Sequence, residues 1–360
     1  MGPVRRIAPL VLAALLLAAV AWGAPVAAAE TGRTLYVATN GRDFADDGWS
    51  VPPNSIDTPW RSIEWAVRRA RAGDRIVVRA GTYQEVVGWG AVKGTSTRPI
   101  RLEAYDGERV TVKGILQFKG ADYWMIRRIN VVRDGALGRK EFLVKFDGGV
   151  GWQFRDSEVS GTNGVSNVMV IGSSTNGQPR DWVIAGNCIH DNDATGDGPM
   201  QDHNIYVYPG LSSGPGRIER NIFFNAENGG HIKLAGPNSS TGAAYVTVSH
   251  NTMVRGAAGV VLGYGTHHTT LWRNLVGSQA GGTATYRAAY VANHLTGSTN
   301  ASAYLGVWGY AKSVAATNLT TRPIASRDVT WVRPTFDSTT SCTGFHPSDA
   351  GSSKFGRYAP

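Results

Sequence analysis

Apolar and polar residues alternate in short runs along the middle of the chain. In DHNIYVYPG (202–210) and GGHIKLAGP (229–237), every second residue of the central part is apolar. The same alternation recurs in SNVMVIG (166–172) and AGVVLGYG (258–265). A period of two is typical of β-strands, because successive side chains of a strand point to opposite faces. The chain therefore contains repeated strands, each with an inward and an outward face.

A second motif recurs out of step with the first: an apolar residue, two further residues and then asparagine. It ends at Asn187, Asn221, Asn251 and Asn274, with a degenerate copy that ends at Ser157. Subtracting these positions gives spacings of 30, 34, 30 and 23 residues. Repeats of this length with short strands indicate a solenoid, and asparagines at equivalent turns can stack into a hydrogen-bonded ladder. We therefore predict an all-β chain folded as a parallel β-helix, since the hairpin signals of a propeller are missing.

The segment TPWRSIEWAVRRARAGD (58–74) predicts one amphipathic helix before the first repeats. Thr58 suits the N-cap, Pro59 the first helical position and Gly73 the end of the helix. RIVVRAGTYQE (75–85) follows directly and alternates like a strand. Because a solenoid exposes an apolar cross-section at its end, we expect the helix to cap it.

The first 29 residues have the features of a secretory signal peptide. Arg5 and Arg6 precede an apolar run (10–22), and Ala27 and Ala29 fit the small-residue pattern of a cleavage site. The run is short for a membrane span, and no other segment is long and apolar enough to cross a bilayer. We therefore expect a secreted protein with no membrane contact after cleavage.

The chain is expected to contain one elongated domain, because a solenoid grows along one axis and escapes the usual size limit of a single core. We expect it to be a monomer. The predicted parts are the signal peptide (1–29), an N-terminal strand, loop and capping helix (30–74), β-helix coils (75–335) and a C-terminal tail (336–360).

Charge and cysteine content narrow the partners. A formal net charge of +9 on an exported chain suggests an acidic or carbohydrate partner, whereas the lack of a Lys/Arg run disfavours nucleic acid. Cys188 and Cys342 are the two cysteines of the chain. Export permits a disulfide between them, but Cys188 can equally be a small apolar filler in the ladder.

Several segments together resemble a known family. YVATNG, TPWRSIEWAVRRARAGDRIVVRAGTYQE, RPIRLEAYDGERVTVKG and the asparagine-bearing repeats are similar to secreted right-handed parallel β-helix proteins of the pectate-lyase-like superfamily. The resemblance extends over about residues 35–277 and is specific for the fold, not for the substrate. It implies a reaction, because many proteins of this superfamily cleave uronate polysaccharides by β-elimination.

Equivalent residues of a parallel solenoid form columns, because neighbouring coils lie about 4.8 Å apart. Aligning the inward residues places Asn204 beside His231 and Tyr206 beside Lys233. The column of Tyr206 continues back through Met169, Lys145 and Gln117, and the neighbouring column holds Tyr208, Asp147 and Lys119. We therefore predict one outward strip of polar residues, formed by Lys119, Lys145, Asp147, Asn204, Tyr206, Tyr208, His231 and Lys233.

This strip suits an extended acidic glycan, because lysine offers charge and tyrosine a flat amphipathic face. β-Elimination needs a cation at the uronate carboxylate, a base for the C5 proton and a donor for the leaving oxygen. We expect Lys233 to be the neutraliser or the base, its pKa lowered by burial or by nearby cations, and His231 and Tyr206 to be base and acid in an order left open. The expected substrate-binding residues are Lys145, Asp147, Asn204, Tyr208, Lys119 and Arg220. His203, one residue before the strip, is expected to be a buried structural histidine unless a bend intervenes.

The segment DNDATGDGPMQD (191–202) resembles a calcium loop in its spacing of acids. The expected calcium ligands are Asp191, Asp193, Asp197 and Asp202. A solvated Asp/Gly turn is the alternative, since the fifth-position ligand and the bidentate glutamate are missing.

The most favoured function is a polysaccharide lyase that cleaves an acidic polysaccharide. Two alternatives stay open: a glycoside hydrolase on the same fold, which would use clustered carboxylates, and a non-catalytic glycan-binding or cell-wall-binding solenoid.

Overall fold

A computed structural model of the chain describes residues 2, 32–138, 142–192, 202–209, 214–236, 241–263, 265–277, 287–291, 302–308 and 329–360. Residues 32–360 form one compact unit, and the predicted signal peptide lies outside the described residues. Among the described residues, no helix combines the length and the apolar character that crossing a membrane requires.

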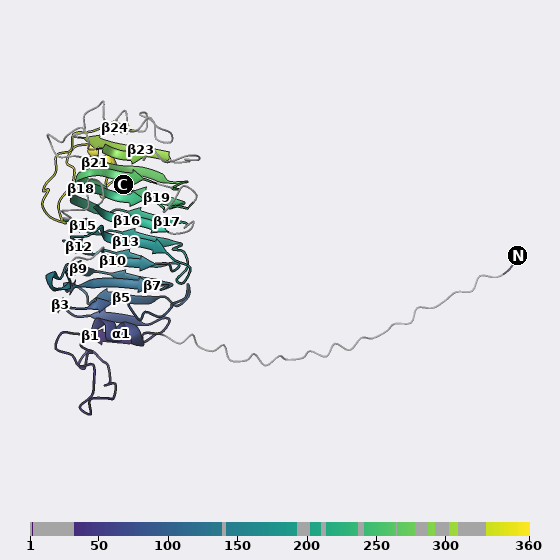
Figure 1. Cartoon of the computed structure of the whole chain (residues 1–360), viewed down its shortest axis with the longest axis vertical. Helices are drawn as coiled ribbons and strands as arrows, with labels where there is room; N and C mark the ends of the chain where they lie inside the picture. The colour runs from purple at the N-terminus through teal and green to yellow at the C-terminus, as the bar shows by residue number, and fades with distance from the viewer. Residues whose placement is uncertain are drawn as a thin grey trace. The chain divides into compact units, whose positions relative to one another are not determined.

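The strands stack one above another in a parallel solenoid (Figure 1). Their pairings fall into three series, which we call the first, second and third sheets. The first sheet contains β1 (Thr34–Val37), β2 (Arg75–Val78), β5 (Ile100–Ala104), β8 (Trp124–Arg127), β11 (Gln153–Arg155), β14 (Trp182–Ala185), β17 (Gly216–Glu219), β19 (Val246–Ser249) and the starts of β21 (Thr270–Gly277) and β23 (Ser302–Trp308).

The second and third sheets follow the first within each coil, and long strands bend from the second into the third. The second sheet contains β3 (Gly81–Tyr83), β6 (Val110–Lys113), β9 (Ile129–Val132), β12 (Glu158–Ser160), β15 (Cys188–His190), the starts of β18 (Ile222–Leu234) and β20 (Thr252–Leu262), the ends of β21 and β23, and β24 (Val329–Trp331). The third sheet contains β4 (Val86–Val87), β7 (Ile115–Lys119), β10 (Phe142–Asp147), β13 (Ser166–Gly172), β16 (His203–Pro209), the ends of β18 and β20, and β22 (Arg287–Val291). The predicted fold, an all-β parallel β-helix, is confirmed.

Inward side chains from the three sheets fill the interior of the coils. Aromatic rings stack from one coil to the next, with ring centroids 3.9 Å apart between Phe146 and Trp152 and 5.5 Å apart between Trp152 and Trp182. These side chains are fully buried. Burying a large aromatic side chain stabilises a fold by about 1.5–3 kcal/mol, so this stack contributes much of the stability of the central coils.

The predicted asparagine ladder lies at the corner between the first and second sheets. The side-chain oxygen of each ladder asparagine accepts a backbone N–H from the preceding coil at 2.9–3.0 Å, and the ladder runs through Ser157, Asn187, Asn221, Asn251 and Asn274. Each side-chain N–H₂ also donates to a backbone carbonyl of the preceding coil, for example from Asn221 to Ile184 at 3.0 Å. The residue before each ladder position has positive φ, as at Arg220 and His250. The ladder therefore holds a backbone conformation that costs about 1–2 kcal/mol per non-glycine residue.

Replacing Asn221 by alanine is expected to lower the free energy of unfolding by about 2–4 kcal/mol, because it leaves buried groups of Asn187 and Ile184 without partners. Chemical denaturation of the variant and the wild-type protein measures the difference. The exposed Asn40 provides the matched control, since its change to alanine should alter the free energy of unfolding by less than about 0.5 kcal/mol. Equal effects of the two substitutions would contradict a stabilising ladder.

The N-terminal helix is shorter than the sequence predicts. Helix α1 (Ile63–Arg69) begins after the N-cap Ser62, whose side chain accepts from the Trp65 N–H at 3.1 Å. The Glu85 carboxylate also accepts the N–H of Ile63 and the N–H of Glu64. The prediction that Thr58 is the N-cap and that Pro59 opens the helix is wrong, because Ser62 and Glu85 satisfy the free N–H groups four residues later. That α1 caps the solenoid stays a prediction.

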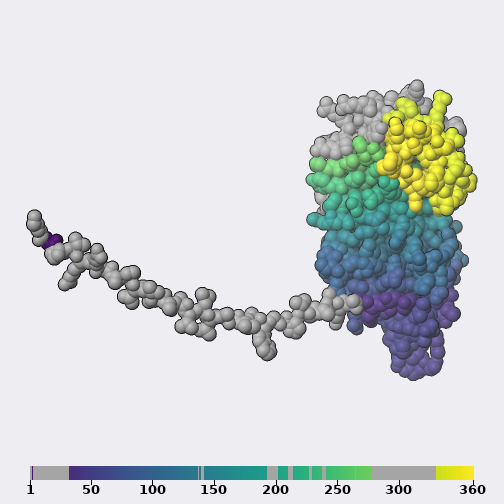
Figure 2. Space-filling view, turned by 180° about the vertical axis from the view of Figure 1, so that it is seen from behind, coloured from purple at the N-terminus to yellow at the C-terminus, as the bar shows by residue number. Residues whose placement is uncertain are grey.

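The C-terminal segment folds back along the side of the coils (Figure 2). Cys342 forms a disulfide with Cys188 of β15. Phe345 and Phe355 are fully buried, Phe345 against Ile222 and Phe224 of the second sheet. The outward face of the second sheet is therefore apolar at β15, β18 and β20 and is covered there by the tail. The tail also contains the short helix η3 (Ser352–Lys354). A second short helix, η1 (Gly135–Leu137), follows β9.

Candidate functional site

The columns of the third sheet have the register that the sequence predicts. Tyr206 pairs with Lys233, and the column continues back through Met169, Lys145 and Gln117. The neighbouring column runs from Tyr208 through Ile171 and Asp147 to Lys119. Among the partly exposed polar side chains on this outward face are Lys119, Lys145, Tyr206, Tyr208 and Lys233. We call these five residues the basic strip.

Lys233 and Tyr206 form the centre of the basic strip. The Lys233 ammonium lies 4.8 Å from the centre of the Tyr206 ring, and the rings of Tyr206 and Tyr208 are 5.2 Å apart. Burial lowers the pKa of Lys233 below its usual range and raises the pKa of Tyr206 above its usual range. Lys233 is therefore easier to deprotonate than an ordinary lysine, while Tyr206 keeps its proton.

His203 lies beside this centre, and it is fully buried and hydrogen-bonded, as the sequence predicts. Its ring lies 5.6 Å from that of Tyr206. Burial, and after it the Lys233 charge, lowers the pKa of His203. Nδ1 lies 3.1 Å from both the N–H and the carbonyl oxygen of Gly230, so it accepts from the first or donates to the second according to the tautomer. Nε2 is buried and has no hydrogen-bond partner in the described part of the chain.

His231 and Asn204 are not surface residues, so their predicted place in the outward strip is wrong. Both are buried, and the Asn204 side-chain N–H₂ donates to His231 Nδ1 at 3.0 Å. Asn167 donates in turn to Asn204 at 2.9 Å and to the His190 carbonyl at 2.9 Å. These side chains bridge the corner between the second and third sheets, where the register of β18 against β20 shifts. Period-two alternation fails at this corner, so Asn167, Asn204 and His231 point into the coil.

The remaining strip residues have local partners. Lys119 lies with its ammonium 3.9 Å from the centre of the exposed Trp89 ring, and Lys145 has its ammonium 4.9 Å from that of Phe142. Asp147 is 8% exposed and accepts from Asn176 at 2.8 Å. The prediction that Asp147 is an outward binding residue is wrong, because the turn that contains Asn176 covers its carboxylate.

Arg220 lies at the ladder corner and not on the third sheet. Its guanidinium donates to the backbone carbonyls of Arg357 at 3.1 Å and of Ala359 at 2.9 Å. Its predicted role in substrate binding is therefore wrong, because it holds the C-terminal tail. Of the two causes expected for a lowered Lys233 pKa, burial or nearby cations, burial accounts for it.

The predicted calcium ligands are only partly described. Asp193 and Asp197 lie outside the described residues, and Asp202 is fully buried. Asp191 accepts from Asn225 through one carboxylate oxygen at 2.6 Å and contacts His190 Nδ1 through the other at 2.8 Å. Calcium would have to displace these contacts to use Asp191, so this residue fits the ion poorly and calcium binding stays a prediction.

Stability should depend on pH through the two buried histidines. Burial lowers the pKa of His203 and of His231 to about 3, below the ordinary value near 6.5. Between about pH 3 and pH 6.5 these two histidines bind two more protons in the unfolded chain than in the folded chain. The free energy of unfolding therefore decreases as the pH falls through this range. The expected loss is about 2–3 kcal/mol per pH unit below pH 6. Denaturant unfolding at several pH values measures this slope.

The matched variant is His231→Gln, which should lower the slope by about 1.4 kcal/mol per pH unit because it removes one titrating group. His190 does not interfere in this range. Burial opposes its charge, but Glu158 and Asp191 outweigh burial and raise the pKa of His190, so it is protonated in both states at low pH. A free energy of unfolding that stays constant from about pH 7 to pH 5 would contradict the assignment of neutral buried histidines.

Comparisons with known proteins find local sequence similarity to two curated proteins. No family model matches the chain. Over 111 residues the chain is 32% identical to pectate lyase PEL9 of Emericella nidulans, which covers 25% of this chain and 25% of that protein. Over 86 residues it is 33% identical to the uncharacterized protein YwoF of Bacillus subtilis, which covers 23% of this chain and 16% of that protein. The chain therefore spans a quarter or less of the length of these curated relatives.

Two solved structures resemble the fold at low sequence identity. The complex of XylC with xylose has a TM-score of 0.48 at 11% identity and covers 68% of this chain and 69% of that chain. Pectate lyase Pel9A has a TM-score of 0.42 at 16% identity and covers 82% of each chain. The stacked parallel strands of the structure itself confirm the predicted resemblance of fold, and the chain is a parallel β-helix protein.

Proposed function

We propose that this protein is a polysaccharide lyase that cleaves a uronate-containing polysaccharide by β-elimination at the basic strip. The observation that carries the proposal is Lys233, a half-buried lysine on the outward face of the third sheet. Its lowered pKa suits a general base, and its neighbour Tyr206 keeps a proton that it can donate. The local similarity to a pectate lyase supports a pectic substrate as the first to be tested.

The reaction needs two proton transfers on one sugar linkage. Neutral Lys233 takes the C5 proton of the uronate, and the electron pair forms the C4–C5 double bond as the C4–O4 bond breaks. Tyr206 gives its proton to the leaving O4. Both side chains project from paired positions on one face, which allows base and acid to act from the same side of the sugar. The fully buried ring of His203 lies 5.6 Å from that of Tyr206, so it packs beside the proton donor and does not itself reach the substrate.

The rest of the strip supplies binding. Lys145 lies three strands from Lys233 in the same column, about 14 Å away at the usual strand spacing. Lys119, one strand further, lies against the exposed Trp89. Cations spaced along the axis with aromatic faces between them suit an extended polyanion, so we propose that the polymer runs parallel to the solenoid axis. Asp202, Asp193 and Asp197 would be the residues to hold a calcium ion, which would help to neutralise the uronate carboxylate.

Glycoside hydrolysis receives less support, because that chemistry uses two carboxylates beside the linkage and none of the five strip residues is acidic. A non-catalytic binding protein would need no half-buried lysine beside a protonated tyrosine.

The test is ultraviolet absorbance of unsaturated uronides during incubation with pectate, alginate, glucuronan and glycosaminoglycans, each with calcium and with a chelator. We expect absorbance to rise on one acidic polysaccharide, and a requirement for calcium would show as loss of the signal with chelator. New reducing ends without absorbance would indicate hydrolysis instead. Retention on the polymer without any product would indicate a binding protein.

A further inference from the structure

We infer that the first sheet carries a second glycan-binding site, which takes one sugar unit of an acidic polysaccharide in a hollow between β14 and β19. The hollow has a volume of about 360 Å³, within the range of small-molecule sites. It lies on a different sheet from the basic strip. The choice of an acidic polysaccharide as ligand rests on the proposed function, whereas the hollow itself does not.

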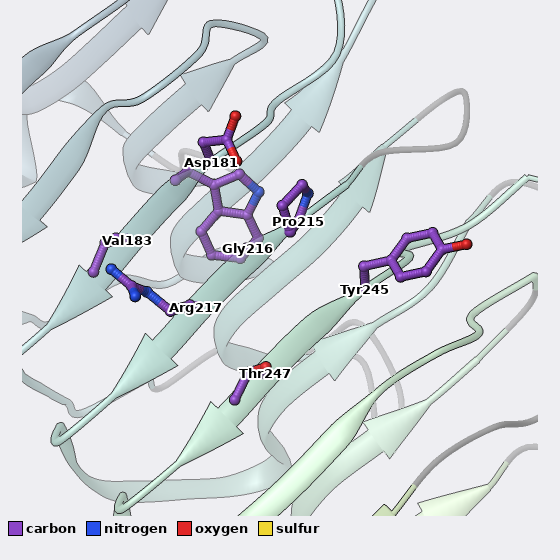
Figure 3. Close-up of a pocket in the computed structure, with 8 residues that line it drawn as sticks. Asp181, Val183, Pro215, Gly216, Arg217, Tyr245 and Thr247 are labelled. Atoms are coloured by element: carbon purple, nitrogen blue, oxygen red, sulfur yellow. The ribbon is translucent and has the colours of Figure 1, made fainter. Parts of the chain in front are cut away.

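The hollow exists because one coil lacks side chains where its neighbours have them. The register aligns Trp182 with Gly216 and Gly216 with Val246, so Asp181, Pro215 and Tyr245 occupy equivalent positions in three successive coils. Figure 3 shows Pro215 between Asp181 and Tyr245. Two coil spacings separate the outer two residues, about 10 Å. Pro215 of the middle coil therefore forms the floor of the hollow, and Asp181 and Tyr245 of the two outer coils form its walls.

Glycines on both sides of Pro215 keep this floor low. A Cβ atom at Gly214 would lie 3.5 Å from the Tyr245 ring, and a Cβ atom at Gly216 would lie 2.1 Å from the Trp182 indole. Any longer side chain at Gly214 would therefore cover the tyrosine ring. The indole of Trp182 is buried and packs on Trp152, so it backs the floor rigidly from inside.

Tyr245 provides a fixed aromatic wall. Its side chain is 53% exposed although it is one of the larger apolar side chains. The ring stacks on His268 with centroids 4.6 Å apart and meets the edge of His267 at 5.7 Å. His267 and His268 belong to the segment that leads into the following coil, and Pro215 belongs to the preceding coil. The ring is therefore supported from one side and open towards the hollow, as a platform for the C–H face of a sugar must be.

Two charged groups beside the floor are available to a ligand. The Asp181 carboxylate is exposed and has no hydrogen bond or ion pair within the described ranges of the chain. Arg217 is exposed, and its guanidinium lies 3.9 Å from the Glu219 carboxylate. Arginine binds carboxylates through paired N–H donors, and a carboxylate accepts hydrogen bonds from hydroxyls. We therefore assign the uronate carboxylate to Arg217 and a sugar hydroxyl to Asp181, with the ring against Tyr245.

A second weak site on the same polymer raises the affinity for long chains through effective concentration. The test is retardation in native gels that contain pectate or alginate, with all variants made in a Lys233→Ala background so that no polymer is degraded. Tyr245→Ala and Arg217→Ala should each weaken retention about tenfold, the usual effect of losing an interface anchor. Tyr245→Phe keeps the platform and should restore retention. Trp272→Ala, at a 43% exposed aromatic of the same sheet, is the matched control and should change nothing.

This inference would be overturned if Tyr245→Ala and Arg217→Ala were retained as strongly as the Lys233→Ala background protein and unfolded like it. It would also be overturned if neither pectate nor alginate retained the background protein at all. Failure of the lyase proposal has a different readout. A wild-type protein that forms no unsaturated uronide, but whose retention depends on Tyr245, would reject elimination and retain the second site.

Discussion

Replacing Lys233 by alanine is expected to lower the rate of β-elimination by about a thousandfold. A positioned general base contributes about 10²–10⁴ to a rate, and the expected loss lies in the middle of that range. The pairing of Tyr206 with Lys233 puts both side chains at one position of the polymer, so no neighbouring group replaces the amine. Initial rates of ultraviolet absorbance with the best substrate measure the effect.

The matched control is Lys145→Ala, in the same column three strands away. It removes an identical charge from the binding surface but not from the reacting atoms, so it should raise KM several-fold and leave kcat nearly unchanged. If Lys233→Ala and Lys145→Ala had equal effects on kcat, Lys233 would be a binding residue only.

Two roles of Lys233, as a base or as a neutraliser of the carboxylate, can be distinguished by the Lys233→Arg variant and by the pH dependence of the wild-type rate. Arginine stays charged at all working pH values, so it can neutralise a carboxylate but cannot take a proton. A base must be neutral, so the rate should rise with pH up to the pKa of Lys233, which burial shifts to lower pH than that of a free lysine. A neutraliser must be charged, so the rate would fall over the same range. We expect Lys233→Arg to be as inactive as the alanine variant and the wild-type rate to rise with pH.

The sequence was sufficient to predict the register of the third sheet because apolar residues at inward positions fix the phase of each strand. A slip by one residue would move Ile205 and Val207 out of the core, so the pairing of Tyr206 with Lys233 follows from the alternation alone. The ladder asparagines were predictable for a similar reason: each must satisfy buried backbone groups at the same corner, so the same residue type recurs.

The corner between the second and third sheets was not predictable from alternation. Asn167, Asn204 and His231 each come directly before the first inward apolar residue of a third-sheet strand. Strict alternation therefore places them on the outward face. They turn inside because backbone carbonyls of the second sheet need donors at the bend, as the bond from Asn167 to the His190 carbonyl shows. A polar residue that recurs at this fixed place is itself a ladder signal, and it resembles the asparagine motif of the other corner.

The cover of the second sheet was also missed, although the sequence contains its signal. Ile222 and Phe224 are apolar at outward positions, which an exposed sheet face would not require. Apolar residues on both faces of a strand indicate that another element covers it. The glycine- and serine-containing tail lacked regular periodicity, so local patterns could not show that its phenylalanines fill this face.

Removing the disulfide between Cys188 and Cys342 is expected to have the largest effect on stability of any change considered. The two cysteines are separated by 154 residues, and closing a loop of that length restricts the unfolded chain by about 5 kcal/mol in the chain-entropy model. The Cys188→Ala/Cys342→Ala variant should therefore lose about 2–5 kcal/mol of unfolding free energy, the usual range for such bonds. Chemical denaturation of the variant and of the oxidised wild-type protein measures the loss.

The tail itself should loosen in the same variant, because the disulfide fixes its position on the second sheet near Phe345. Contacts from Arg220 and Arg273 to the backbone of the last residues remain, but exposed hydrogen bonds contribute only about 1 kcal/mol each. Limited proteolysis should therefore cleave the variant within 336–360 at protease levels that leave the oxidised protein intact. The triple substitution that adds Phe345→Ala separates covalent from apolar attachment: it should cleave faster still if the phenylalanine holds the tail. Equal cleavage of the oxidised protein and the double variant would show that packing alone keeps the tail in place, and the disulfide would then act mainly on the unfolded chain.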